Sequence, residues 1–214
     1  MLSLDIDRAE VNQADLDQQR IALEEQLRSR FHEVPRDEIR QLSVMNAYTQ
    51  YYKRFKKTYH VLLQLDSICN KNRSIPHSEP LVQAMFMAEM NSFILTAGHD
   101  LDQIQGQITL ESSGGSEAYQ NLRGDRVTCK KGDMLMEDSR GTICSIIYGQ
   151  DQRTRITHDT RRVLYVMYVP PGVDASQVEK HVLDLESNLL LVVPSSQTHL
   201  RQIMLADSPE PVNL

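Results

Sequence analysis

The spacing of apolar residues in the first third of the chain predicts helices. Leu16, Leu23 and Leu27 lie seven and four residues apart, so they share one face of a helix over residues 15–30. The apolar residues of segment 79–95 occupy most faces of a helix, which places that helix inside the molecule. Similar periodicity predicts helices over residues 37–55, 59–68 and 175–190.

After Gly98 the period shortens to that of strands. The segments alternate polar and apolar residues or form short β-branched runs between turns. The predicted strands cover residues 107–110, 126–129, 134–136, 142–148 and 162–169. Their connections are too short for helical crossovers, so the strands pair mostly antiparallel. The order predicts an α+β fold with a mostly antiparallel β-sheet core, N-terminal helices and a C-terminal helix.

This order divides the 214 residues into three parts. A helical N-terminal segment (1–58) packs on a strand-rich body (59–194), and a loose C-terminal tail (195–214) follows. The length is sufficient for one domain with a real hydrophobic core.

Composition narrows the class of protein. The net charge of −6 excludes a strongly basic nucleic-acid coat, and no apolar run approaches the ~20 residues that span a bilayer. Three widely spaced cysteines argue against a disulfide framework or a C-x-x-C zinc site. The N-terminus lacks a basic-then-apolar signal. We therefore expect a cytoplasmic protein with no membrane partner, metal or cofactor.

The densest titratable cluster is His99-Asp100-Leu101-Asp102. A histidine beside carboxylates can act as a general base or a metal ligand. No other histidine or cysteine stands at ligand spacing, which disfavours a metal. The alternative is that Asp100 caps a short helix over residues 101–104, with His99 in the preceding turn.

A second cluster is the polar segment 149–160 between two predicted buried strands. Loops mounted on rigid strands often carry binding groups. Its arginines can bind phosphate, and its Thr and Gln side chains can hydrogen-bond an amine or a carboxylate. The alternative is a solvated loop whose Asp and Thr side chains make local turns.

Basic residues also cluster locally despite the net acidity. They are Lys53, Arg54, Lys56 and Lys57; Arg123, Arg126, Lys130 and Lys131; and Arg153, Arg155, Arg161 and Arg162. Cations at a helix C-terminus are expected from the macrodipole, which favours an ordinary solvated surface. A folded basic patch can also hold RNA. The glycines of segment 113–116 lack the Gly-Lys-Ser/Thr ending of a phosphate loop, so a hairpin loop is predicted there.

Several short motifs occur in a fixed order between roughly residues 45 and 192. They are residues 47–55, 89–95, 98–106, 131–133, 138–141 and 147–149, followed by Ile156, Thr157 and Thr160. In order and spacing they resemble the B3/B4 domain. That domain is found in the β subunit of bacterial phenylalanyl-tRNA synthetase and in free-standing proteins of about this length.

The resemblance implies an α+β fold in which a pocket forms near the buried helix and the polar loop. In the synthetase, this pocket hydrolyses tyrosine mischarged onto the phenylalanine tRNA. A second site of this kind removes near-isosteres that a hydrophobic synthetic site rejects poorly. Ester cleavage needs a positioned water and stabilisation of the developing oxyanion.

Carried over to this sequence, the resemblance implies a role for each of eight residues. His99 or Asp151 orients the water, and the remaining residues bind the amino acid (Asn91, Gly149 and Thr157) or the RNA (Arg153, Arg155 and Arg161). The histidine-bearing segment is shorter than in the synthetase, and Gly149 stands where the synthetase has a glycine pair. Binding is therefore better supported than catalysis.

Two hypotheses follow. In the first, the chain is a B3/B4-type protein that binds aminoacyl-tRNA or its amino-acid moiety and hydrolyses mischarged tRNA in trans. In the second, it is a non-catalytic module for a small amino-acid-like ligand or a protein partner. The residues leave open whether it is an enzyme, its oligomeric state, and which tRNA or amino acid is bound. No class I or class II synthetase signature is present, so it is not an aminoacyl-tRNA synthetase on its own.

Overall fold

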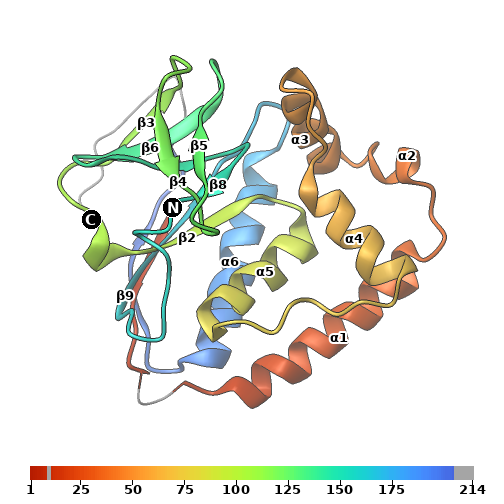
Figure 1. Cartoon of the computed structure of the whole chain (residues 1–214). Helices are drawn as coiled ribbons and strands as arrows, with labels where there is room; N and C mark the ends of the chain where they lie inside the picture. The colour runs from red at the N-terminus through yellow and green to blue at the C-terminus, as the bar shows by residue number, and fades with distance from the viewer. Residues whose placement is uncertain (9–10, 205–214) are drawn as a thin grey trace.

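The first half of the chain is mostly helical, as predicted (Figure 1). The computed structural model describes residues 1–8 and 11–204. Its helices here are α1 (Gln13–Phe31), α2 (Arg36–Ile39), α3 (Ser43–Arg54), α4 (His60–Asn70) and α5 (Pro80–Ser92). The helix predicted over residues 37–55 is wrong in one respect, because it is interrupted between α2 and α3. Ile39 of α2 is buried where α2 contacts α4. The tyrosines of α3 are instead buried against the strand-rich body, so the two helices cannot share one axis.

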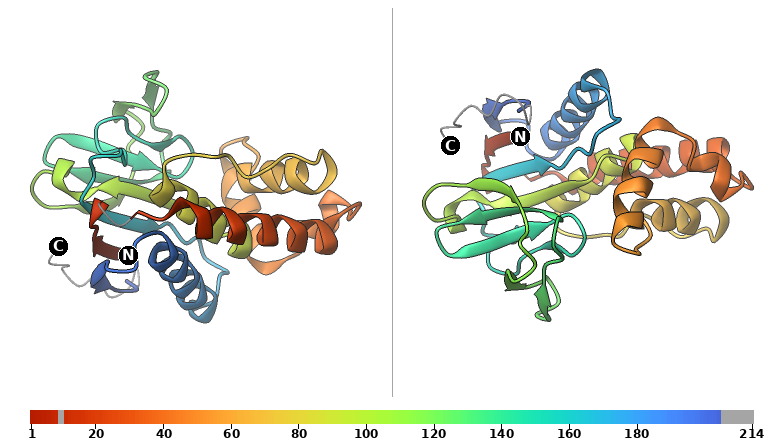
Figure 2. Two further views of the ribbon diagram at one scale, coloured as in Figure 1. Left: turned by 90° about the horizontal axis from the view of Figure 1, so that it is seen from below. Right: turned by 90° about the horizontal axis from the view of Figure 1, so that it is seen from above.

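Three antiparallel sheets follow in the described chain, which confirms the α+β class. The first has the order β10-β1-β9-β2, from β10 (Gln197–Arg201), β1 (Leu2–Asp5), β9 (Arg162–Met167) and β2 (Thr96–Asp100). The second has the order β3-β6-β7-β8, from β3 (Thr109–Ser112), β6 (Met134–Asp138), β7 (Gly141–Ser145) and β8 (Gly149–Gln150). The last pairs β4 (Ala118–Gln120) with β5 (Arg126–Thr128), and helix α6 (Ala175–Val192) precedes β10. Figure 2 shows the strands gathered at one end of the molecule and helices α1 to α4 at the other.

The ends of the chain differ from the prediction. The prediction of a loose tail from residue 195 is wrong for β10, which pairs with β1. The N-terminal segment is not wholly helical, because β1 pairs with β9 in the body. β10 is a short, largely exposed edge strand and carries no clear period-two pattern. In β1, by contrast, Leu2, Leu4 and Ile6 alternate with polar residues, a strand signal that the prediction of a helical segment did not use. Residues 205–214 lie outside the described residues.

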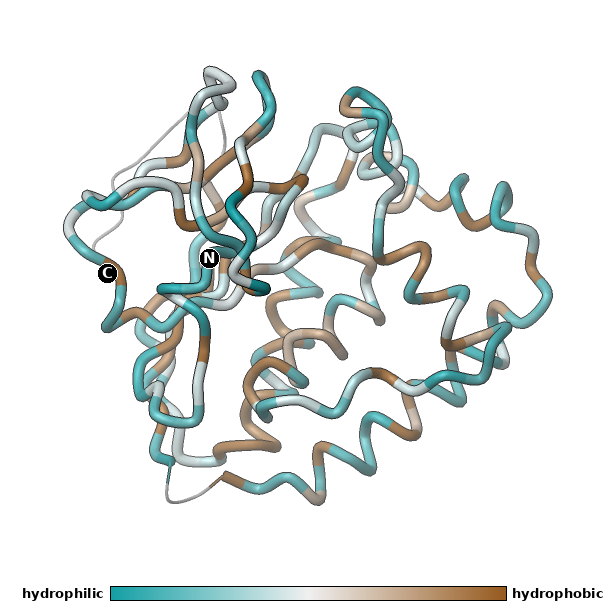
Figure 3. The backbone as a smooth tube through the Cα atoms, in the orientation of Figure 1, coloured by the Kyte–Doolittle hydropathy of each residue, from teal (hydrophilic) through white to brown (hydrophobic). Residues whose placement is uncertain are grey.

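The core forms around β9 and the paired helices α5 and α6. Figure 3 shows apolar stretches along α5 and the central strands. Two of the buried tyrosines satisfy their hydroxyl groups on main-chain carbonyls: Tyr48 donates to Tyr168 at 2.8 Å and Tyr59 to Phe93 at 2.9 Å. The Tyr48 and Tyr59 rings stack with their centroids 4.5 Å apart. These bonds let large polar-tipped side chains fill the core without an unpaired donor.

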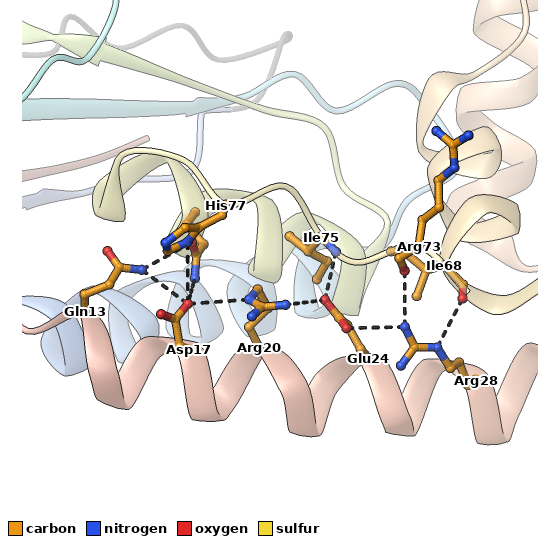
Figure 4. A network of polar contacts seen from close by, with 10 residues as sticks. Gln13, Asp17, Arg20, Glu24, Arg28, Ile68, Arg73, Ile75 and His77 are labelled. Atoms are coloured by element: carbon orange, nitrogen blue, oxygen red, sulfur yellow. Dashed lines mark hydrogen bonds and ion pairs between the residues drawn. The ribbon is translucent and has the colours of Figure 1, made fainter. Parts of the chain in front are cut away.

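A row of charged residues along α1 holds the long connection between α4 and α5 (Figure 4). Glu24 is only 4% exposed. Its carboxylate accepts hydrogen bonds from the Ile75 amide at 2.8 Å and from Arg20 at 2.8 Å, while Arg28 lies at 3.3 Å. Asp17, about two turns earlier than Glu24, accepts from Gln83 at 3.0 Å. The row replaces apolar packing where the connection has no secondary structure of its own.

Replacing Glu24 should therefore destabilise the fold. The Glu24→Ala variant leaves a buried amide unpaired and two guanidinium groups without their carboxylate, so we expect a loss of about 2 kcal/mol in the free energy of unfolding. Urea unfolding measures it. Glu25→Ala, at the exposed neighbouring position, should change stability by less than about 0.5 kcal/mol. Equal effects of the two variants would contradict the role of the row.

Candidate functional site

The polar segment 149–161 forms one wall of a cleft of about 810 Å³. The other walls come from the turn after β2, from β4 and from the start of β7. Its charged lining is balanced, with the arginines Arg140, Arg153, Arg155 and Arg161 and the aspartates Asp100, Asp102, Asp151 and Asp159. The neutral lining residues are Gln103, Ala118, Tyr119, Gln120, Thr142, Gln152 and Thr157. Such a lining suits a ligand that carries both signs of charge.

Local side-chain hydrogen bonds shape this wall. Asp151 accepts from the Thr154 amide at 3.1 Å and from the Thr154 hydroxyl. The Thr160 hydroxyl donates to Asp100 at 2.7 Å and accepts from the Thr157 amide at 2.9 Å. The local turns expected of a solvated loop are confirmed, and the same turns hold a cleft wall in place.

His99 stands directly behind this wall. It lies in β2 opposite Leu164, so the prediction that it occupies a turn is wrong. Asp100 does accept from the Asp102 amide at 3.0 Å and caps the short helix η2 (Leu101–Gln103), which confirms the capping alternative. The sequence around His99 predicts a turn because β2 is short and contains Gly98.

A three-residue hydrogen-bond chain links His99 to the cleft. The Thr154 hydroxyl donates to Asp151, so its oxygen accepts from His99 Nδ1, 2.7 Å away. This arrangement puts the imidazole proton on Nδ1. His99 Nε2 is buried and has no hydrogen-bond partner in the described part of the chain.

Burial sets the protonation of both ends of that chain. It lowers the pKa of His99 to about 3, and the nearby Arg153 cation contributes to the shift. The side chain is therefore neutral near pH 7. Burial also raises the pKa of Asp151, although hydrogen bonds from Thr154 partly offset the effect. Asp151 lines the cleft and His99 does not, so Asp151 is the group placed to meet a water.

The cleft arginines fall into two kinds. Arg153 contacts both carboxylate oxygens of the buried Asp138 at 2.9 Å and donates to the Gln103 carbonyl at 2.6 Å. Hydrogen bonds from main-chain amides and from Arg153 outweigh the effect of burial, and the pKa of Asp138 is lowered. Arg153 is therefore a structural cross-link as well as a lining residue.

The other three guanidinium groups are available to a ligand. Arg155 donates to the Gln152 carbonyl at 3.1 Å, and within residues 1–8 and 11–204 neither Arg140, Arg155 nor Arg161 forms an ion pair. Arg140 and Tyr119 were not predicted. They come from the β6–β7 turn and from β4, so only the paired strands bring them beside segment 149–161.

The predicted amino-acid-binding residues do not all meet. Thr157 lines the cleft, and the Gly149 carbonyl accepts from the Tyr119 hydroxyl at its edge. Asn91 does not line it. Its amide donates to Asp184 of α6 at 2.7 Å. A role for Asn91 beside the cleft remains a prediction that this geometry does not favour.

The glycine-rich segment 113–116 already holds an anion of the protein itself. The Glu117 carboxylate accepts from the Ser113 hydroxyl at 2.6 Å and from the Gly114 amide at 2.8 Å and the Gly115 amide at 3.0 Å. The Ser113 bond and these amides lower the pKa of Glu117 to about 2. The segment joins β3 to β4, which pair with different strands, so the predicted hairpin is wrong.

The described residues contain neither a metal-binding cluster nor a membrane-spanning helix. No group of three or more His, Cys, Asp and Glu side chains there is placed to hold a metal ion. None of the helices formed by these residues has the length and apolar content needed to cross a membrane.

Fold and site together define an α+β domain with a charged cleft where its sheets meet. The chain belongs to the B3/4 domain family, whose model matches residues 43–188, more than half of the chain. The match begins at residue 43, inside the segment 1–58 that is predicted to pack on the body, and close to residue 45, where the resemblance was expected to begin. A search of curated proteins found no match.

Among solved structures, the chain is similar to the crystal structure of an N-terminal fragment of the phenylalanyl-tRNA synthetase beta-subunit from Pyrococcus horikoshii. Sequence identity is 16% and the TM-score is 0.46. The similarity covers 58% of this chain and 43% of that fragment.

The two kinds of arginine should separate in stability measurements. Arg153→Gln leaves the buried Asp138 carboxylate without its cation, so we expect a loss of about 2 kcal/mol in the free energy of unfolding. Arg155→Gln, in the same wall, should cost less than about 0.5 kcal/mol. Urea unfolding of both variants tests this, and a neutral Arg153→Gln variant would show that the cross-link is dispensable.

His99 should make the fold acid-sensitive. An unfolded histidine titrates near pH 6.5, whereas the folded pKa is about 3, so below pH 6.5 the unfolded chain binds a proton that the folded chain excludes. The contribution of His99 to the free energy of unfolding is fully present above pH 6.5 and decreases as the pH falls. The loss amounts to about 2 kcal/mol at pH 5.

A difference between variants isolates the contribution of His99 to this acid sensitivity. Urea unfolding between pH 7 and pH 5 should show a smaller loss of stability for His99→Gln than for the wild type. His158→Gln, whose side chain is 88% exposed, should keep the wild-type slope. Identical slopes for the wild type and His99→Gln would contradict the buried neutral state. The buried His181, with its pKa lowered by burial to about 4, contributes equally in all three proteins.

Proposed function

We propose that the cleft binds the aminoacylated 3′ end of a tRNA and that the protein hydrolyses mischarged species in trans. The observation that supports this most directly is the presence, in one cleft, of a buried carboxylate at Asp151 and three guanidinium groups without ion-pair partners among the described residues. A tRNA end offers phosphates to the arginines and an ester to the carboxylate.

Asp151 is the proposed base. Oδ1 accepts from Thr154, while Oδ2 lies 3.7 Å from Arg153 Nε, and Asp151 lines the cleft. The water oxygen attacks the ester carbonyl carbon, and its proton passes to Asp151. The bond between that carbon and the ribose oxygen then breaks, and the ribose oxygen takes the proton. The raised pKa of Asp151 makes it a stronger base than an exposed aspartate.

His99 acts only as a positioning residue in this proposal. It is buried behind Thr154 and cannot reach a ligand in the cleft without displacement of the wall. Through Thr154 it orients the Asp151 carboxylate. The proposal therefore shifts the role of base from the histidine to the aspartate.

The test is a deacylation assay with several mischarged tRNAs and the full chain. Asp151→Asn keeps an acceptor for Thr154 but cannot take a proton, so the rate of release should fall about 10²-fold or more. Asp125→Asn, at an exposed aspartate outside the cleft, should retain the wild-type rate. Release by the wild type no faster than in buffer would overturn the enzymatic proposal.

Binding is measured in the same experiment by retention of aminoacyl-tRNA. Retention without release would favour the alternative, a non-catalytic module for an amino-acid-like ligand. If the protein neither retains nor hydrolyses aminoacyl-tRNA, the assignment of the cleft to a charged tRNA end is overturned.

A further inference from the structure

Two basic segments that are far apart in sequence lie side by side on the surface. One follows the end of α3 and the other follows β5. Lys130 Nζ donates to the Phe55 carbonyl at 2.9 Å, and Arg54 contacts the Gly132 carbonyl at 3.4 Å. We call this the α3–β5 surface, and its cations are Lys53, Arg54, Lys56, Lys57, Lys130 and Lys131.

These cations are not neutralised by the protein. None of the six forms an ion pair with a carboxylate within the described chain. The nearest acidic residue along the chain, Asp133, is buried and accepts from the Tyr51 hydroxyl at 2.7 Å. The helix macrodipole accounts for Lys53 and Arg54 at the end of α3, but not for lysines contributed by the β5–β6 turn. Six like charges in one area repel each other, so an external anion would relieve that repulsion.

A recess beside the surface adds hydrogen-bond donors. It has a volume of about 590 Å³. Its lining includes the cations Arg40, Lys53 and Lys57, polar residues of α3 and the following turn, and Leu62 of α4. Thr49, also in its lining, has a buried hydroxyl without a partner in the described residues. Arg40 pairs with Asp37 at 2.7 Å, so Lys53 and Lys57 are the lining cations that remain for a phosphate group.

The side chains around the surface favour a phosphodiester backbone over a membrane. None of the large apolar side chains that are exposed in the described residues belongs to the surface, so nothing there would insert into lipid. Lys57 lies 5.4 Å above the ring of Tyr148, which is half-buried and immediately precedes Gly149 at the cleft edge. Lys57 and Tyr148 therefore connect the surface to the edge of the cleft.

We propose that the α3–β5 surface binds the ribose–phosphate backbone of the tRNA whose aminoacylated end enters the cleft. The identity of the RNA rests on the proposed function. The surface is separate from the cleft arginines and is expected to supply affinity for the body of the RNA, while the cleft supplies the chemistry.

The test compares two triple variants of the full chain. The first is Lys53→Gln with Lys57→Gln and Lys131→Gln on the surface. The control removes three exposed cations elsewhere, by Arg30→Gln, Arg73→Gln and Lys180→Gln. Fluorescence anisotropy with unacylated tRNA is measured over a range of salt concentrations. The surface variant should bind at least about tenfold more weakly than the wild type. The slope of its log affinity against log salt should be shallower, by an amount that corresponds to about two phosphate contacts, and the control should bind as the wild type does.

A short substrate separates this proposal from the hydrolytic one. Adenosine esterified with an amino acid fits the cleft but is too short to reach the surface, so the surface variant should hydrolyse it at the wild-type rate. Loss of tRNA binding in the surface variant supports the surface proposal. If the wild type also hydrolyses nothing, only the catalytic proposal is overturned.

Three results would overturn the surface proposal. They are equal affinity of both triple variants for tRNA, equally tight binding of the wild type to polyglutamate of matched charge, and absence of tRNA binding by the wild type at low salt. The melting temperature of each variant is measured alongside. A surface variant that melts at or above the wild-type temperature shows that its loss of binding does not come from unfolding.

Discussion

Strand β9 needs a hydrogen-bonded partner along each edge, and much of the molecule is arranged to supply them. Val163, Leu164 and Tyr165 are fully buried, so their main-chain amides and carbonyls cannot turn to water. β2 pairs along one edge and β1 along the other. The N-terminus is thereby drawn into the centre of the sheet.

The same pairing builds the cleft. β2 carries His99 and Asp100 to the level of Leu164 and Val163, and segment 149–161 must cross beside them before β9 can begin. Just beyond β1, Arg8 donates to the carbonyls of Thr157 and Thr160 at 2.6 Å each. The wall is thus held from both sides, by Asp100 and by Arg8. A rigid wall of this kind can hold Asp151 at one position relative to a ligand.

The parts that could be predicted from the sequence are those whose signal is local. α5, α6 and β9 have strong apolar patterns, and Asp151, Thr157, Arg155 and Arg161 reach one cleft because they share one short segment. Arg140 and Tyr119 join them only through strand pairing, which no local pattern encodes. The partner of Asn91 could not be predicted for a different reason: α5 is apolar on most faces, so its sequence does not indicate which side faces α6. β10 has no periodic signal, whereas the alternation of Leu2, Leu4 and Ile6 with polar residues does mark β1 in the sequence.

The net charge of −6 gives a false impression of the surface. Six carboxyl groups are buried in the described residues, namely Glu24, Glu89, Asp100, Asp133, Asp138 and Asp151, whereas no lysine or arginine is. The buried acids equal the net charge in number, so the remaining charges are formally balanced. Most of these acids have a structural role, because they accept hydrogen bonds that hold strands, turns and the α1 row in place. The cations stay outside, where those of the cleft and of the α3–β5 surface can meet an anion. An acidic composition is therefore compatible with a polyanionic partner, because the excess acid lies inside the fold.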